Sequence, residues 1–203
     1  MRGLVRVGAA VPSLALGNVK ENMKRHLAMM REAKEKHVSI VTFPELSLTG
    51  YTCGDLFFQR RLLDDVTDAL LTLKNEMPEG ILAVVGAPLE IEGALYNCAV
   101  VLHKGEIISA VPKTFLPNNG EFYEKRWFQS GDARRDASVA IPKLKTDVCR
   151  QAIFETEDGV RFGIELCEDL WAPLPPSTML SVEGAEIILN LSASNELLSK
   201  REY

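Results

Sequence analysis

Two long amphipathic stretches alternate with short apolar runs in the first part of this chain, and this alternation limits the folds available to it. The apolar side chains of residues 18–36 recur every three or four positions, which is the spacing of one helix face. They are Val19, Met23, Leu27, Met30 and Ala33. Residues 62–73 repeat this spacing, so the sequence predicts two helices, each packed on one side.

The intervening apolar runs are short and often β-branched, as in buried strands. Strands are expected at residues 4–10, 38–43, 81–85, 97–103, 106–111 and 186–191. Lys104-Gly105 predicts a hairpin turn, and residues 154–166 predict a second hairpin. A third helix is expected from about Ser177, after three prolines, and residues 117–132 are expected to form a long loop. Strands mixed with helices in this order predict an α/β sandwich.

The composition is that of one soluble globular domain. The chain has 203 residues, of which 46% are hydrophobic and 25% charged, and a formal net charge of −5. This acidic balance, without a run of Lys or Arg, disfavours a nucleic-acid partner. No apolar stretch is long enough to predict a membrane partner. The four cysteines show no CxxC spacing, which predicts reduced thiols in a cytoplasmic protein.

Three chemically distinct side chains lie at or just beyond the ends of predicted strands. Residues 160–166 alternate between apolar and polar, and Cys167 follows them directly. Glu45 comes after one apolar run and Lys113 after another. Taken singly, each has an ordinary explanation: a buried core thiol, a turn carboxylate and a solvated lysine. Together they offer a nucleophile, a base and a cation.

That combination fits amide cleavage. Attack on a carboxamide requires deprotonation of the thiol, stabilisation of an oxyanion and protonation of the departing ammonia. The three histidines lie in predicted regular elements, which disfavours a Cys-His hydrolase. The sequence contains no GxxxxGK[ST], GxGxxG or GxSxG motif and no Cys/His cluster at zinc spacing.

With these segments in order, the chain resembles the carbon–nitrogen hydrolase (nitrilase) superfamily, whose signature is a Glu-Lys-Cys triad. Residues 43–45, 112–113 and 165–169 are similar to its three motifs. Glu124 matches a second family glutamate that orients the lysine. The resemblance implies a four-layer α-β-β-α sandwich across residues 1–203, with Glu45, Lys113, Cys167 and Glu124 as catalytic residues.

A closer resemblance is to the amide-hydrolysing domain of glutamine-dependent NAD⁺ synthetases, through residues 45–57, 95–99, 116–124 and 190–194. It implies glutamine hydrolysis through a γ-glutamyl thioester, without a cofactor, and ammonia transfer to a C-terminal synthetase domain that uses ATP and Mg²⁺. It also implies a homo-oligomer. The corresponding substrate-binding positions are Tyr51, Asn119, Phe122, Glu168, Ser194 and Lys200. The family usually has tyrosine where this chain has Asn119.

The chain stops at Tyr203, about a dozen residues after the last predicted strand, so we expect the sandwich to be truncated at its C-terminus. It contains no SGGxDS-type pyrophosphate loop, so we expect the synthetase domain to be absent and the chain alone not to make NAD⁺. Two alternatives remain at this point. One is a stand-alone amidase or carbamoylase, and the other is a non-catalytic remnant that acts as an interaction module.

Overall fold

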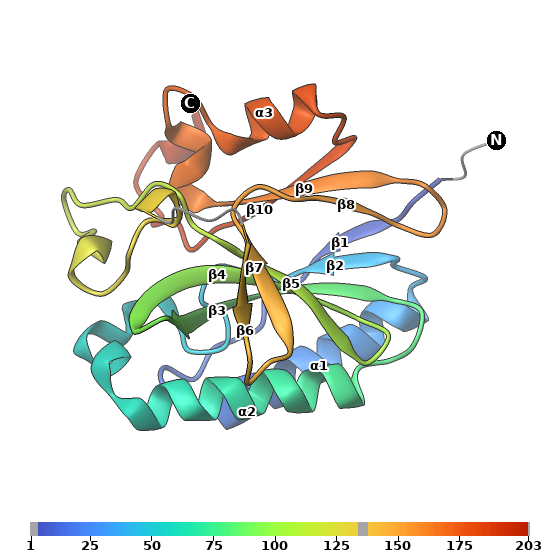
Figure 1. Cartoon of the computed structure of the whole chain (residues 1–203), viewed down its shortest axis with the longest axis horizontal. Coiled ribbons are helices and arrows are strands. Elements are labelled where there is room, and N and C mark those ends of the chain that lie inside the picture. Colours follow the sequence, from blue (N-terminus) through green and yellow to red (C-terminus); the bar gives the residue numbers. More distant parts are fainter. Residues whose placement is uncertain (1–3, 134–137, 203) are drawn as a thin grey trace.

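Four layers of secondary structure make up the molecule (Figure 1). The computed structural model describes residues 4–133 and 138–202. Helices α1 (Val19–Glu35) and α2 (Arg60–Glu76) cover one face of a seven-stranded sheet. A three-stranded sheet lies on the opposite face, and α3 (Pro176–Val182) covers its outer side. The expected α-β-β-α order is confirmed.

The larger sheet combines parallel and antiparallel pairs in the order β1-β2-β3-β4-β5-β7-β6. Its strands are β1 (Val7–Ala9), β2 (Ile40–Thr42), β3 (Leu82–Ile91), β4 (Ala94–His103), β5 (Glu106–Pro112), β6 (Ser138–Ile141) and β7 (Thr146–Cys149). Strands β1 to β3 are parallel and β3 to β5 antiparallel, while β7 is parallel to β5 and antiparallel to β6.

The smaller sheet has the order β10-β9-β8. Strands β8 (Ile153–Glu155) and β9 (Arg161–Leu166) form the predicted hairpin, and β10 (Ile187–Leu191) is parallel to β9. In this register Leu191 is opposite Leu166, so the residues that directly follow β10 and β9 lie side by side.

Both faces of the larger sheet are buried, because helices cover one and the smaller sheet covers the other. On β3, Ala83 and Val85 belong to the core beneath the helices, while Val84 belongs to the core between the sheets. Phe162 and Leu189 reach that second core from the smaller sheet. Two-sided burial explains why these strands are continuous apolar runs.

The main elements match the sequence expectations, with two corrections. Strand β3 does not end near Gly86 but continues to Ile91, because Gly86 is an extended strand residue paired with Ala99. The β6–β7 hairpin was not predicted, since its two strands have only four residues each. The remaining short elements are the 3-10 helices Tyr51–Phe58, Glu124–Arg126, Gly131–Ala133, Cys167–Trp171 and Lys200–Glu202.

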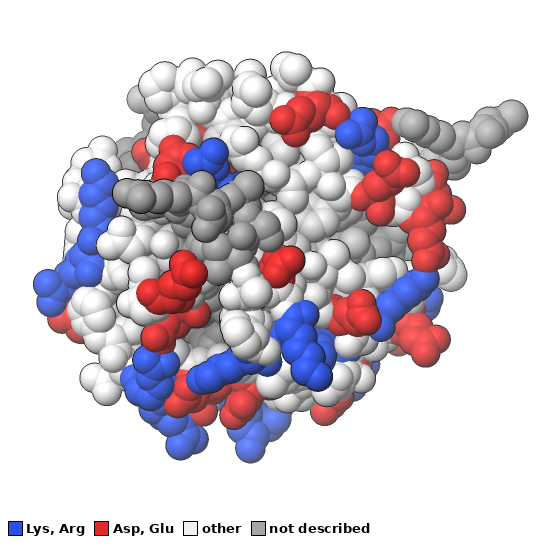
Figure 2. Space-filling model, in the orientation of Figure 1, with Lys and Arg blue, Asp and Glu red and all other residues white. Residues whose placement is uncertain are grey.

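Charged side chains of both signs are interspersed over the face shown in Figure 2, with many of them along the lower edge, where α2 lies. The region around α3 is largely uncharged, and Trp171, Leu174 and Val182 are exposed there. Within the described ranges, no helix has the combination of length and apolar character needed to cross a bilayer.

Candidate active site

Glu45 lies in a tight turn that follows β2. Its neighbour Leu46 has a φ of 51°, a left-handed conformation uncommon for a residue with a side chain. The turn lies against Gly86, where an added Cβ would be 2.3 Å from the Pro44 carbonyl oxygen and 2.4 Å from the Leu46 nitrogen. Gly86 therefore leaves the space that the backbone around Glu45 occupies.

Helix α1 supports the same turn through two buried polar side chains. Asn22 Nδ2 donates to the Leu48 carbonyl at 3.0 Å, and His26 Nε2 lies 2.9 Å from Ser47 Oγ. Burial lowers the pKa of His26 to about 4, although its contact with the Asn22 carbonyl opposes this shift. At neutral pH the imidazole is therefore uncharged. It donates from Nδ1 to Asn22, which leaves Nε2 to accept the Ser47 hydroxyl.

Lys113 directly follows β5, and its backbone is bonded on both sides. Its N–H donates to the Asn97 carbonyl at 2.8 Å, and its carbonyl accepts the Gly131 N–H at 2.8 Å. The side chain is fully buried. The lysine is therefore fixed at the base of the loop that continues to Glu124.

Cys167 directly follows β9, as the sequence predicted. Its φ of 43° is again left-handed, so the chain turns sharply at the thiol. The pairing of Leu166 with Leu191 brings Ser192 and Ala193 beside Cys167. The residue is half-buried.

The Lys113 ammonium joins two carboxylates from distant segments. Its Nζ lies 2.6 Å from Glu45 Oε1 and 2.7 Å from Glu124 Oε1. The exposed fractions of these side chains are 0–1%. Tyr51 donates its hydroxyl to Glu124 Oε1 at 2.7 Å. The structure thus brings four predicted site residues into one buried network, in which each carboxylate is paired as burial requires.

The two oxygens of Glu45 have different environments. Oε1 accepts from Lys113 Nζ and, at 2.7 Å, from Asn97 Nδ2. Oε2 accepts from the Ala193 backbone N–H at 3.1 Å. The Ala193 N–H also hydrogen-bonds the Cys167 thiol. Oε2 is therefore the carboxylate oxygen that shares a donor with the sulfur.

The charges in this network shift one another's pKa values. Burial alone would lower the pKa of Lys113, but the Glu45 and Glu124 carboxylates and Cys167 outweigh it and raise the pKa, so the ammonium persists. Burial raises the pKa of Glu124, aided by Glu45 and opposed by Lys113. Burial, followed by the charge of Glu124, raises the pKa of Tyr51, which keeps its hydroxyl a donor.

The Cys167 thiol has a raised pKa, first through burial and then through the nearby charge of Glu45. Lys113 and hydrogen bonds from Ser192 and Ala193 oppose the shift without cancelling it. At neutral pH the sulfur is therefore predominantly protonated. A nucleophile in that state needs a base that removes its proton as it attacks.

Phe122, Glu168 and Asn119, three of the six predicted substrate-binding residues, lie in different places around the network. Phe122 packs edge-on against Tyr51, with ring centroids 6.1 Å apart. Glu168 lines a pocket of about 410 Å³ together with Phe115 and Trp171. Asn119 is exposed, outside the buried network. Of these residues, Phe122 makes the direct contact with the network, through Tyr51.

Ser194 and Lys200 are in contact with each other. Lys200 Nζ lies 2.6 Å from Ser194 Oγ and 2.7 Å from both oxygens of Asn195. Asn195 also hydrogen-bonds Glu121, in the loop that contains Phe122. The segment after β10 is therefore linked to that loop through Glu121.

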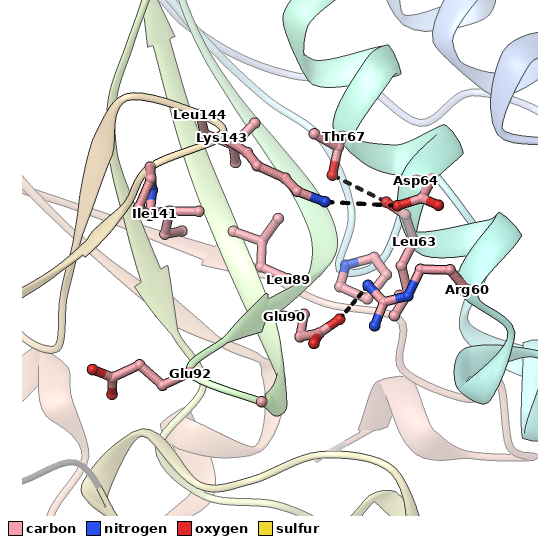
Figure 3. Close-up of a pocket in the computed structure, with 13 residues that line it drawn as sticks. Arg60, Leu63, Asp64, Thr67, Leu89, Glu90, Glu92, Ile141, Lys143 and Leu144 are labelled. Atoms are coloured by element: carbon pink, nitrogen blue, oxygen red, sulfur yellow. Dashed lines mark hydrogen bonds and ion pairs between the residues drawn. The ribbon is translucent and has the colours of Figure 1, made fainter.

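A separate pocket of about 320 Å³ lies between α2, the end of β3 and the β6–β7 turn (Figure 3). Two ion pairs lie at its rim: Arg60 with Glu90 at 2.5 Å, and Lys143 with Asp64 at 3.9 Å. None of its lining residues is Cys or His. In the part of the chain that the structure describes, no group of three or more His, Cys, Asp or Glu residues is arranged to hold a metal ion.

Residues 6–202 match the family model described as carbon-nitrogen hydrolase. The chain belongs to the carbon–nitrogen hydrolase family. A curated relative is the glutamine-dependent NAD⁺ synthetase of Mycobacterium tuberculosis, 36% identical over 203 residues. That alignment covers 98% of this chain and 30% of the relative, so this carbon–nitrogen hydrolase chain spans about a third of the length of such relatives.

Two solved structures resemble this chain. The glutamine-dependent NAD⁺ synthetase of Cytophaga hutchinsonii superimposes with a TM-score of 0.84 at 28% identity, covering 98% of this chain and 32% of that one. An amidase from Nesterenkonia sp. superimposes with a TM-score of 0.76 at 16% identity, covering 97% and 68%. The second likeness shows the carbon–nitrogen hydrolase fold alone.

Three polar groups of this carbon–nitrogen hydrolase site were not predicted as site residues. Asn97 is an interior residue of β4, where a polar side chain in an apolar run was the available signal. Ser192 and Ala193 contribute through a hydroxyl and a backbone N–H beside Cys167. The role of Ala193 could not be predicted from the sequence, because its donor is a backbone N–H, which every residue except proline has.

Proposed function

We propose that this chain is the glutamine amidohydrolase part of a glutamine-dependent NAD⁺ synthetase, with Cys167 as nucleophile, Glu45 as general base and acid, and Lys113 as oxyanion donor. One observation carries the proposal: the Lys113 ammonium is held between two buried carboxylates beside a thiol of raised pKa. The family membership and the glutamine-dependent relatives supply the substrate class.

In the first half-reaction, Cys167 Sγ attacks the side-chain carbonyl carbon of glutamine while its proton moves to Glu45. The carbonyl π electrons move to oxygen and form an oxyanion. Lys113 has three N–H donors, of which Glu45 and Glu124 take two, and we assign the third to this oxyanion. As the carbon–nitrogen bond breaks, Glu45 returns the proton to the leaving nitrogen, releasing ammonia and leaving a γ-glutamyl thioester.

In the second half-reaction, water attacks the thioester carbonyl and gives a proton to Glu45. The carbon–sulfur bond then breaks, the sulfur regains that proton, and glutamate leaves. The cycle consumes one glutamine and one water and yields one glutamate and one ammonia. It requires no cofactor, so a metal chelator should leave the rate unchanged. Glu124 acts through Lys113 and does not touch the substrate. Tyr51 donates to Glu124 and, beside Phe122, is proposed to contact the substrate as well.

The surrounding residues fit an amino-acid amide substrate. We propose that Phe122 and Glu168 lie near the amide, and that Ser194 and Lys200 lie near the α-amino and carboxylate end. Asn119 would occupy the place of the family's usual tyrosine. Lys200 already contacts Ser194 Oγ and both Asn195 oxygens, so a bound carboxylate would share this ammonium with them.

The deciding experiment measures ammonia release from glutamine, with asparagine and propionamide as competing substrate classes and Cys167→Ala as the blank. Preference for glutamine supports the proposal, while equal rates on simple amides indicate a stand-alone amidase. No release from any amide indicates a non-catalytic module. An electrophilic glutamine analogue should label Cys167 and leave Cys53 and Cys98 unmodified, since both are buried.

We further propose that the ammonia is delivered to a linked synthetase domain, where ATP and Mg²⁺ activate deamido-NAD⁺. The test supplies such a domain together with this chain and compares glutamine with free ammonia as the nitrogen source. Formation of NAD⁺ from glutamine that depends on Cys167 is the expected result. Formation from ammonia alone, with glutamine inert, would contradict the proposal.

A further inference from the structure

Asp169 connects the two segments that carry Lys113 and Cys167. Its Oδ1 accepts the backbone N–H groups of Thr114, at 3.0 Å, and Phe115, at 2.7 Å. Its Oδ2 accepts the backbone N–H of Leu166 at 3.0 Å. Thr114 directly follows Lys113, and Leu166 directly precedes Cys167.

These bonds join the two sheets at the place where the reactive side chains emerge. Thr114 and Phe115 continue from β5 of the larger sheet, whereas Leu166 ends β9 of the smaller one. Asp169 is only 1% exposed, so the three bonds are shielded from water. Burial raises the pKa of Asp169 to about 7, opposed by these three hydrogen bonds and by the charge of Lys113, so the carboxylate is predominantly ionised at pH 8. Hydrogen bonds to a charged acceptor in such surroundings are stronger than those between neutral groups.

A local role explains only part of this arrangement. The bond between Oδ2 and Leu166 begins the short 3-10 helix Cys167–Trp171, much as a capping side chain does. That role needs one oxygen and one N–H. The two bonds accepted by Oδ1 lead to a different sheet and contribute nothing to that helix, so capping does not account for them.

We propose that Asp169 is a positioning residue that sets the Lys113 ammonium against the Cys167 thiol. The ammonium is one of the groups that lower the pKa of Cys167, so its distance from the sulfur controls both thiol ionisation and oxyanion stabilisation. The inference rests on the proposed function in taking Cys167 as the nucleophile. Asp169 itself touches neither the thiol nor the substrate.

The first measurement is the rate at which iodoacetamide alkylates Cys167 as a function of pH. Asp169→Asn keeps the size of the side chain but turns a donor toward at least one of the three backbone N–H groups. We expect the Cys167 pKa to rise and the alkylation rate at pH 8 to fall by about tenfold, equivalent to one weakened charged hydrogen bond. Glutamine turnover should show kcat lowered by about 10–100-fold, with KM changed by less than about threefold.

The matched control is Glu165→Gln. Glu165 is equally buried and accepts hydrogen bonds from Ser177 N, in α3, and from Asn190 Nδ2, in β10, so neither bond reaches the larger sheet. Its loss should lower the melting temperature without changing the pH profile of alkylation. If Asp169→Asn behaves in the same way, Asp169 is merely structural and the proposal is overturned.

Asp169→Glu provides a second variant, because it keeps the carboxylate and adds one methylene. It should shift the alkylation profile in the same direction by a smaller amount, and an unchanged profile in this folded variant would overturn the proposal. Alkylation needs no glutamine. If the unsubstituted chain releases no ammonia, the proposed function fails while the alkylation profiles still test the role of Asp169.

Discussion

Glu45 Oε2 accepts a hydrogen bond from the backbone N–H of Ala193, a residue 148 positions away in sequence. The same N–H hydrogen-bonds the Cys167 thiol, whereas Glu45 Oε1 is engaged by Lys113 and Asn97. In the proposed mechanism Oε2 would therefore be the atom that receives the thiol proton, while Oε1 anchors the carboxylate.

Replacing Glu45 with Gln should separate turnover from thiol reactivity. Loss of the base should lower kcat for ammonia release by about 10²–10⁴-fold. Loss of its negative charge should lower the Cys167 pKa, since that charge helps to raise it, and should speed alkylation at neutral pH. Parallel assays of ammonia and of iodoacetamide labelling provide the check. Slower labelling, or unchanged turnover, would contradict the assignment.

Lys113→Met should destabilise the fold, because it leaves the Glu45 and Glu124 carboxylates buried without their cation. Removing one partner of a buried ion pair costs about 3–5 kcal/mol. Lys143→Met is the control: that side chain is 71% exposed and pairs at 3.9 Å, so the expected change is within about 0.5 kcal/mol. Urea titration of both variants gives the comparison, and equal losses would show that the buried network contributes little to stability.

Gly86→Ala should displace the turn that carries Glu45. The new methyl group would lie 2.3 Å from one backbone atom and 2.4 Å from another, so the turn itself must move. We expect a loss of several kcal/mol in unfolding free energy, in the range of severe overpacking at about 3 kcal/mol, together with lost turnover. Gly8→Ala, whose methyl group would meet only the Val38 side chain at 3.2 Å, should be much milder.

His26 should make the fold sensitive to acid. The unfolded chain binds a proton at this residue below about pH 6.5, whereas the folded state does so only near pH 4. The contribution of the neutral His26 to the free energy of unfolding is therefore fully present above pH 6.5. It is lost as the pH falls towards 4, and the total loss is about 3 kcal/mol. Unfolding free energies at pH 7 and 4.5 should differ less in His26→Gln than in the unsubstituted chain. An equal difference in both proteins would rule out this source.

Asn119→Tyr tests the departure from the usual family residue. If a ring at this exposed position packs on bound glutamine, KM for glutamine should fall while kcat stays constant. Steady-state ammonia assays at varied glutamine concentration measure both parameters. An unchanged KM would show that other groups, such as Ser194 and Lys200, fix the substrate.

Much of the fold was readable from the sequence, because helix periodicity and two-sided strand burial both leave direct patterns. The helix predicted at residues 18–36 corresponds to α1, which spans Val19–Glu35 and has Asn18 as its N-cap. The chemistry-bearing side chains Glu45, Lys113 and Cys167 were recognisable for the same reason, since each follows a recognisable strand.

The parts that were not predicted depend on backbone geometry. The donor role of Ala193 follows from the parallel register of β10 on β9, which residue type does not encode. Gly86 was predicted to end a strand, whereas in the structure the absence of a side chain there leaves room for the turn that carries Glu45. Among the residues that the structure describes, no hydrogen-bond partner reaches the buried Asn97 Oδ1 and Glu124 Oε2, and this too depends on the three-dimensional packing.

The three hydrogen bonds accepted by Asp169 have a consequence for sequence variation. All three donors are backbone N–H groups, so these bonds do not depend on which side chains are present at positions 114, 115 and 166. Proline is the exception, because it has no N–H. A saturation library should therefore tolerate conservative changes at these positions and reject proline at each, while position 169 stays intolerant. The side chains at positions 114, 115 and 166 can therefore change during evolution while Asp169 still holds the two segments in place.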